Sequence, residues 1–96
     1  MRSSKSWAKV TYSLTTARSA DRDLRRLEGK ILRQVATKII SLAQNPRPQD
    51  VKLLHGLDRI YRVASVEYRI LYTIDDDKQS VVILHVKNRR EAYRNL

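Results

Sequence analysis

The sequence of 96 residues contains no cysteine, only two isolated glycines and no apolar run long enough to cross a membrane. Without cysteine there is no disulfide framework and no zinc site built on thiolates. Gly29 and Gly56 cannot make the glycine-rich loop that holds phosphates in nucleotide-binding proteins. The first residues are basic but lack the apolar segment of a secretory signal. We therefore expect one cytoplasmic domain, residues 1–96, with no metal, no cofactor and no attachment to a membrane.

Positive charge is the most pronounced property of the composition. The chain has 20 lysines and arginines against 10 acidic residues, which gives a formal net charge of +10. Such an excess is typical of proteins that bind a polyanion, such as nucleic acid, an acidic protein or anionic lipid. The alternative is a basic surface that is merely solvated. The basic residues are spread over both halves of the sequence, so the charge does not belong to a tail.

The first half predicts a strand followed by two helices. Residues 6–14 alternate in polarity, which is typical of a half-buried strand, and Thr15 and Thr16 are plausible N-caps for the next element. Apolar residues then recur at helical spacing in residues 16–28 and 30–44, on either side of Gly29. The two predicted apolar stripes are Ala17, Ala20, Leu24 and Leu27, and Ile31, Val35, Ile39 and Leu42. Helices joined this tightly are expected to form an antiparallel hairpin.

The second half predicts strands. Residues 49–58 form a connector with modest strand character, and three β-branched or alternating runs follow at residues 59–65, 68–74 and 80–86. Short turns between these runs favour a three-stranded antiparallel meander. The last residues, 88–96, are expected to be a short helix or tail. The fold class is therefore α+β, with an N-terminal strand, an antiparallel helical hairpin and a meander whose second face stays open.

Two arginines inside these strands need an explanation, because ionised side chains are costly to bury. If Val66 and Glu67 form a two-residue turn, Arg62 and Arg69 become diagonal neighbours on the face that the helices leave open. Two such cations repel each other unless an anion lies between them, and guanidinium groups bind phosphate in a planar, bidentate manner. The alternative is that each arginine pairs with an acid such as Asp58 or Glu67.

The remaining polar residues restrict the chemistry. The carboxylates are scattered, and His55 and His85 lie 30 residues apart, with His85 interpreted as a structural histidine in a strand. Metal-dependent hydrolysis is therefore disfavoured. Metal-free RNA cleavage remains open, because the ribose 2′-OH can attack the neighbouring phosphate while fixed cations neutralise the developing charge. Proton transfer is the weak point, since arginine is a poor base and tyrosine has a high pKa.

Three segments carry a resemblance to a known family: "KVTYSLTTARSADRDLRRL", "NPRPQDVKLLHG" and "YRVASVEYRILYTIDD…VVILHVKNRREAYR". In their order and spacing they resemble the RelE/ParE superfamily of toxins from type II toxin–antitoxin systems, and the RelE branch most. The resemblance implies an endoribonuclease that enters the ribosomal A site and cleaves mRNA by 2′-OH attack without a metal. It also implies a cognate antitoxin that wraps the toxin, and contact with operator DNA only through that complex.

The resemblance assigns roles to particular residues. Arg62, Arg69 and Arg89 match its basic catalytic positions, and Tyr93 matches a C-terminal tyrosine that stacks on a base near the cut. Lys52 is a weaker match in the "KL" segment. Together with Lys87 and Arg90, which we expect after the last strand, it completes the predicted RNA-binding set.

The sequence departs from the family pattern at three places. Ala64 stands where a second basic residue is frequent, Val66 or Glu67 replaces a turn glycine, and Asn88 replaces a frequent histidine. These departures remove the residues best suited to carry protons. They leave open a slow nuclease that uses Lys87 or a ribosomal group, and an inactive relic of a toxin. The gyrase-poisoning ParE branch, which shares the fold, is the other alternative.

Overall fold

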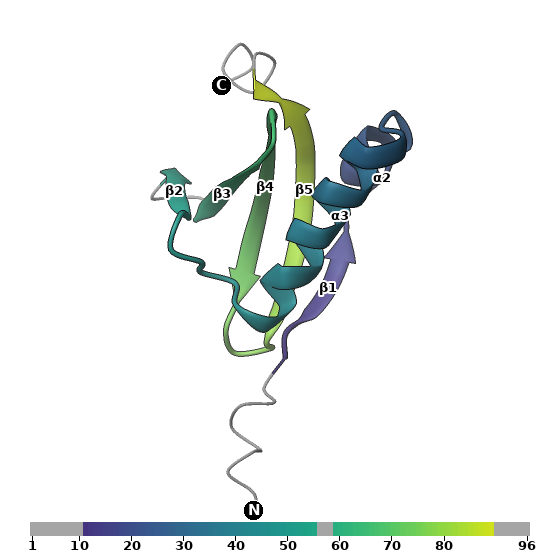
Figure 1. Cartoon of the computed structure of the whole chain (residues 1–96). Coiled ribbons are helices and arrows are strands. Elements are labelled where there is room, and N and C mark those ends of the chain that lie inside the picture. The colour runs from purple at the N-terminus through teal and green to yellow at the C-terminus, as the bar shows by residue number, and fades with distance from the viewer. Residues whose placement is uncertain (1–10, 56–58, 90–96) are drawn as a thin grey trace, which may run out of the picture.

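The computed structural model describes residues 11–55 and 59–89, and these form two helices and five strands (Figure 1). The α+β class predicted from the sequence is confirmed. No helix among the described residues is long and apolar enough to cross a membrane. In chain order the elements are β1 (Ser13–Thr16), α2 (Arg18–Arg25), α3 (Gly29–Gln44), β2 (Lys52–His55), β3 (Ile60–Ser65), β4 (Tyr68–Asp75) and β5 (Ser80–Asn88).

The five strands form one sheet in the order β1-β5-β4-β3-β2. Strands β3, β4 and β5 make the predicted antiparallel meander, and the connector contributes β2 as an antiparallel edge strand. The other edge is β1, which runs parallel to β5. Both helices lie against one side of this sheet, as Figure 1 shows.

The core fills the space between the helices and that side of the sheet. Its sheet residues alternate along the strands, as a half-covered sheet requires. The Tyr61 and Tyr72 rings stack with centroids 5.9 Å apart, and the buried Tyr72 hydroxyl donates to the Pro46 carbonyl oxygen at 2.7 Å. The buried core consists of Ala20, Leu27, Val35, Ile39, Leu42, Tyr61, Val63, Ile70, Tyr72, Val81, Ile83 and Val86.

The prediction for the first strand was wrong in its position. Residues 6–10 lie outside the described residues, and β1 begins only at Ser13. Thr15 and Thr16, predicted as caps, belong to β1 instead, because this stretch pairs with β5 and β-branched residues suit a strand. Ala17 is the N-cap of α2 and makes no side-chain cap hydrogen bond.

The helices follow the predicted pattern with two differences. α2 is shorter than residues 16–28, and residues 26–28 separate it from α3. α3 begins at Gly29, whose φ of +56° favours glycine. The second predicted stripe was wrong at Ile31, which is 40% exposed. The buried side of α3 is centred on Val35, Ile39 and Leu42, so Ile31 falls at its margin.

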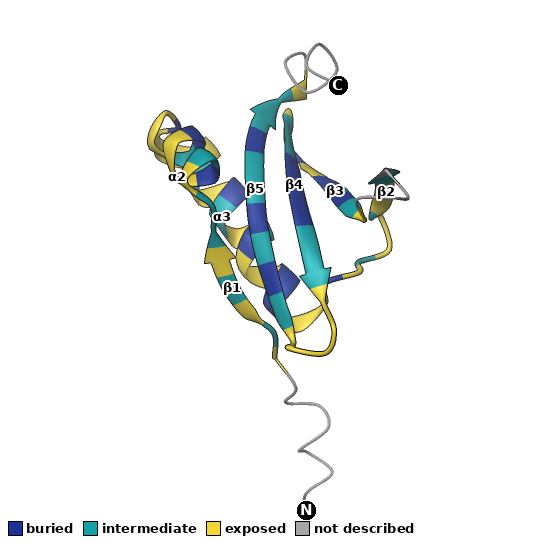
Figure 2. Cartoon of the chain, turned by 180° about the vertical axis from the view of Figure 1, so that it is seen from behind, coloured by how far each residue is buried: buried dark blue, intermediate teal, exposed yellow. Residues whose placement is uncertain are grey.

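The register of β3 and β4 is the one predicted from a Val66-Glu67 turn. Ala64 pairs with Arg69, and Arg62 pairs with Leu71. Val66 takes a φ of +58°, a conformation that a β-branched residue rarely adopts. The helix-free side of the sheet is seen in Figure 2, where β4 and β5 lie in front of α3. This uncovered face carries Arg62, Ala64, Arg69, Leu71 and the side chains that pair with them.

Candidate functional site

Two rows of side chains cross the uncovered face. The first row runs from Arg62 on β3 through Leu71 on β4 to His85 on β5, and the second runs from Ala64 through Arg69 to Lys87. Lys52 on β2 pairs with Arg62 and extends the first row. Adjacent strands lie about 4.8 Å apart, so each three-strand row spans only about 10 Å. The register therefore gathers five residues that were predicted as functional or titratable, from four strands: Lys52, Arg62, Arg69, His85 and Lys87.

The two arginines lie as predicted, as diagonal neighbours on this face. Both are half-buried, Lys52 is exposed, and the aliphatic Leu71 in the middle of the first row is 6% exposed. Within the described residues, no ion pair joins Arg62 to an acid, and Asp58 lies outside them. Diagonal side chains are about 7–8 Å apart at their bases, close enough for one phosphate to contact both guanidinium groups. The arrangement suits a bound polyanion.

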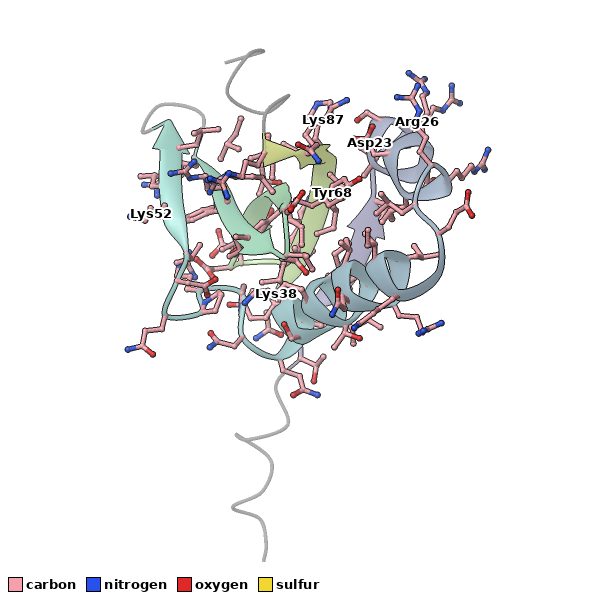
Figure 3. All side chains as sticks on the ribbon, turned by 45° about the horizontal axis from the view of Figure 1, so that its top comes forward. Asp23, Arg26, Lys38, Lys52, Tyr68 and Lys87 are labelled. Atoms are coloured by element: carbon pink, nitrogen blue, oxygen red, sulfur yellow. The ribbon has the colours of Figure 1, made fainter. Side chains whose placement is uncertain are left out.

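Lys87 corrects one prediction, because it lies within β5 rather than after it. Its Nζ is 3.2 Å from Oδ1 of Asp23, a residue of α2 that is only 6% exposed. Figure 3 shows Lys87 and Asp23 side by side where the end of β5 meets α2, with Lys52 on the far edge strand. A buried carboxylate requires such partners to offset its lost hydration. Part of the Lys87 charge is therefore balanced within the protein.

Asp23 also accepts a backbone hydrogen bond from β5 where that strand has no neighbouring strand on one side. β1 ends at Thr16, so the last part of β5 has no neighbouring strand on that side. Instead, Ser19 Oγ donates to the Leu84 carbonyl oxygen at 2.6 Å, and the Val86 N–H donates to Asp23 Oδ2 at 2.9 Å. The register slips at this point, with Leu71 opposite His85 and Tyr72 opposite Ile83, which leaves Leu84 as a bulge. α2 thus holds a bulged strand in place through Ser19 and Asp23.

Sequence reasoning overlooked Asp23, although a signal was present. It lies three residues after Ala20 and four before Leu27, on the apolar stripe of the helix. A carboxylate in that position is expected to be buried and paired. His85, interpreted as structural, lies on the uncovered face with its side chain 43% exposed.

The remaining predicted residues lie at or beyond the end of β5. Arg89 follows the strand directly, is exposed, and its N–H donates to the Glu67 carbonyl oxygen at 2.8 Å. That hydrogen bond holds Arg89 beside the turn that joins β3 and β4. Arg90 and Tyr93 lie outside the described residues, so their roles remain predictions.

A hollow of about 520 Å³ opens near the β4–β5 turn, but its chemistry is different. Arg47 makes a bidentate pair with Asp76 at 2.9 and 3.0 Å and lies over the Tyr61 ring. Arg47 and the Tyr12 hydroxyl both donate to Asp76, and they lower the pKa of that carboxyl to about 2. The cation here is already matched by an acid. The residues that line the hollow are Arg47, Arg59, Tyr61, Thr73, Ile74, Asp75, Asp76, Asp77, Ser80 and Val82.

The chemistry of the uncovered face is that of fixed cations. No group of three or more metal-ligating side chains occurs in the part of the chain that the structure describes. The guanidinium groups can bind phosphate and stabilise added negative charge, and they cannot accept a proton at neutral pH. His85 is the one imidazole among the side chains of the two rows.

Comparison with known proteins shows the family to which the chain belongs. Residues 14–93 match the family model described as the ParE toxin of type II toxin-antitoxin system, parDE. The chain is a member of the RelE/ParE toxin family. Putative toxin RelE1 of Methanocaldococcus jannaschii is 32% identical over 77 residues, which cover 77% of this chain and 86% of the relative. Toxin RelE of Mycobacterium tuberculosis is 31% identical over 84 residues, which cover 86% of this chain and 87% of that toxin.

A solved structure agrees with this family assignment. The chain matches the toxin–antitoxin complex RelBE2 of Mycobacterium tuberculosis with a TM-score of 0.73 and 33% identity. The match covers 83% of this chain and 100% of the compared chain. The RelE-like fold expected from the sequence is therefore confirmed.

Proposed function

We propose that this RelE-family toxin is an endoribonuclease that cleaves mRNA in the A site of the ribosome without a metal. The observation that carries the proposal is the pair Arg62 and Arg69, which lie as diagonal neighbours on the uncovered face. A surface that brings two guanidinium groups this close together is suited to an RNA phosphate. A solvated structural surface gains nothing from placing two cations so close together.

The proposed reaction begins with attack of a ribose 2′-OH on the adjacent phosphorus. Arg62 and Arg69 hold the phosphate and stabilise the charge that develops on its oxygens, and Arg89 reaches the same group from the end of β5. Lys52 and Arg90 bind the flanking backbone. Lys87 contributes less to RNA binding than its charge suggests, because it is paired with Asp23. Tyr93 stacks on a base beside the cut.

A cognate antitoxin is the second partner that we propose. The compared Mycobacterium tuberculosis structure is a toxin–antitoxin complex, and this chain carries a net charge of +10. An acidic or amphipathic segment that folds onto the uncovered face would mask the arginines from RNA. The complex, rather than the toxin alone, would contact operator DNA. Co-expression with the adjacent small gene should restore growth, and failure of every adjacent product to bind or rescue contradicts this part.

A non-nuclease toxin that acts on gyrase is the other candidate, because the matching family model is named after ParE toxins. In that case the uncovered arginines would bind a protein or DNA target. An inactive relic of a toxin belongs to the same alternative. In that case the loss of cleavage would be explained by Ala64 and Asn88, which replace residues suited to carry protons.

The experiment that separates these functions maps mRNA 5′ ends by reverse transcription after brief induction of the toxin. The nuclease function predicts new ends at positions phased with codons, and predicts their loss in Arg69→Ala. Intact mRNA together with trapped gyrase–DNA complexes would establish the alternative instead. Thr73→Ala, on the same strand and face but outside the two rows, is the matched control and should cut like wild type.

A further inference from the structure

His85 occupies a position that suits a proton carrier. It ends the row that begins with Arg62, and it is a diagonal neighbour of Arg69 on the uncovered face. The bases of such neighbours are about 7–8 Å apart, so a phosphate held by Arg69 lies within reach of the imidazole. The side chain is 43% exposed, which leaves part of the ring open to a ligand.

The buried side of the ring faces a carboxylate. His85 Nδ1 is buried and has no hydrogen-bond partner among the described residues, while Asp23 Oδ2 lies 3.7 Å away. A small rotation of the ring would turn this approach into an Nδ1–H···Oδ2 hydrogen bond, and such bonds are often long before substrate binds. Asp23 itself is fixed by the Val86 N–H and by Lys87. A carboxylate held in this way orients an imidazole and sets its tautomer.

We propose that His85 is the general base of the cleavage reaction and that Asp23 is its positioning residue. The inference rests on the proposed ribonuclease function. Nε2 of His85 takes the proton of the ribose 2′-OH as the O2′–P bond forms. The P–O5′ bond breaks, and the departing 5′-oxygen takes a proton from a solvent water. The resulting hydroxide takes the proton from Nε2, which restores neutral His85 and leaves a 2′,3′-cyclic phosphate and a 5′-hydroxyl.

The charges around His85 favour this role. Asp23 approaches from α2, Arg69 lies diagonally on β4, and Lys87 lies two residues further along β5. The carboxylate of Asp23 can balance the positive charge that the imidazole gains when it takes the proton, and the two cations can hold the phosphate beside it. The assignment also supplies a proton acceptor in a chain that has Asn88 and Ala64 at the two family positions where such a group was expected.

The test is the single-turnover rate of cleavage of mRNA on programmed ribosomes, measured from pH 5.5 to 9 with full-length toxin. Wild type should become faster as the pH rises and should then level off, because a general base acts only in its deprotonated form. His85→Gln should be slower by roughly 100- to 10,000-fold and should lose this rise. Added imidazole should restore part of the rate of His85→Ala.

Asp23→Asn provides a measurement that should not change if Asp23 has only a structural role. Its amide oxygen can still accept the Val86 N–H, but the negative charge beside His85 is gone. The midpoint of the pH profile should therefore shift to lower pH, because loss of a nearby carboxylate disfavours the imidazolium. Asp21→Asn, an exposed acid on the same helix, is the matched control and should leave the midpoint unchanged.

The outcomes separate this inference from the proposed function. If wild type cleaves and His85→Gln cleaves within about threefold of it with the same pH profile, His85 is not the base, and the ribonuclease function stands. If wild type does not cleave programmed mRNA at any pH, the proposed function fails and the inference falls with it. If His85→Gln unfolds at a lower temperature than wild type, two other measurements decide whether His85 is the base. These are the rescue of His85→Ala by imidazole and the midpoint of the pH profile of Asp23→Asn. If imidazole does not rescue and the midpoint does not shift, the inference is overturned.

Discussion

The two faces of the sheet use neighbouring residues of the same strands for opposite purposes. On β3, Val63 is 1% exposed within the core, while the preceding Arg62 is half-buried on the uncovered face. On β4, Ile70 is fully buried, and Arg69 beside it belongs to the row that ends at Lys87. The alternation of a strand therefore places residues that hold the fold and residues that carry charge next to each other in the sequence.

The difference between the faces shows how a chain of 96 residues keeps a strongly cationic site. The helix-covered side contains nearly all of the buried apolar residues, so most of the apolar burial that stabilises the fold lies away from the arginine pair. A charged contact links the uncovered side to α2, that of Asp23 with Lys87 and His85. Substitutions on the covered face should consequently change stability, and substitutions on the uncovered face should change cleavage.

The largest effect on the fold is expected from Ile70→Ala. Removal of a fully buried isoleucine costs about 2–5 kcal/mol, through lost burial and the cavity left behind. In a domain of this size, each kcal/mol lowers the melting temperature by about 4–8 °C. Urea denaturation should show this loss. Ile40→Ala, on the solvent side of α3 at 62% exposure, should change stability by less than about 0.5 kcal/mol.

Ala64→Lys should increase activity and leave the fold intact. Ala64 is exposed between Arg62 and Arg69, so a lysine there can reach solvent or an RNA phosphate. One added charged contact is worth about 1.5 kcal/mol, or roughly a tenfold faster cleavage. The rate on ribosome-bound mRNA and the melting temperature should be measured together. A melting temperature several degrees lower would show that the position does not tolerate a long side chain.

Val66→Gly should stabilise the domain without changing cleavage. The φ of +58° at Val66 costs about 1–3 kcal/mol, and glycine relieves it but adds freedom to the unfolded chain. We expect a net gain of about 1 kcal/mol, seen as a higher melting temperature. Glu67→Gly in the same turn is the control, because Glu67 has no positive φ and should gain nothing. A lower melting temperature for Val66→Gly would contradict the turn geometry.

The smallest effect is expected at the exposed pair of Arg47 and Asp76. The pKa of Asp76 is lowered from 3.8 to about 2 by the hydrogen bonds from Arg47 and Tyr12. A lowered pKa in the folded state means that this contribution is complete above about 3.8 and is lost as the pH falls towards 2. Melting temperatures of wild type and Asp76→Asn should thus differ slightly at neutral pH and converge in acid. Parallel curves would show that Asp76 does not contribute in this way.

The sequence predicted the uncovered face well because strand alternation and a two-residue turn determine it locally. The pairings of Arg62 with Leu71 and of Ala64 with Arg69 follow from the Val66-Glu67 turn alone. The bulge at Leu84 and the partners of Asp23 could not be derived in this way. Both depend on where β1 ends and on how α2 packs against β5, which are contacts between residues more than 60 positions apart.

We infer that the uncovered face performs the proposed chemistry and that the covered face holds the fold. The most direct test compares Arg62→Ala with Val63→Ala, adjacent residues on opposite faces of β3, by single-turnover cleavage and by thermal melting. Arg62→Ala should cleave about 100- to 1,000-fold more slowly and should stay within about 0.5 kcal/mol of wild-type stability. Val63→Ala should unfold at a lower temperature and, while folded, cleave like wild type. A fully active Arg62→Ala, or one that loses stability in proportion to activity, would contradict the division between the faces.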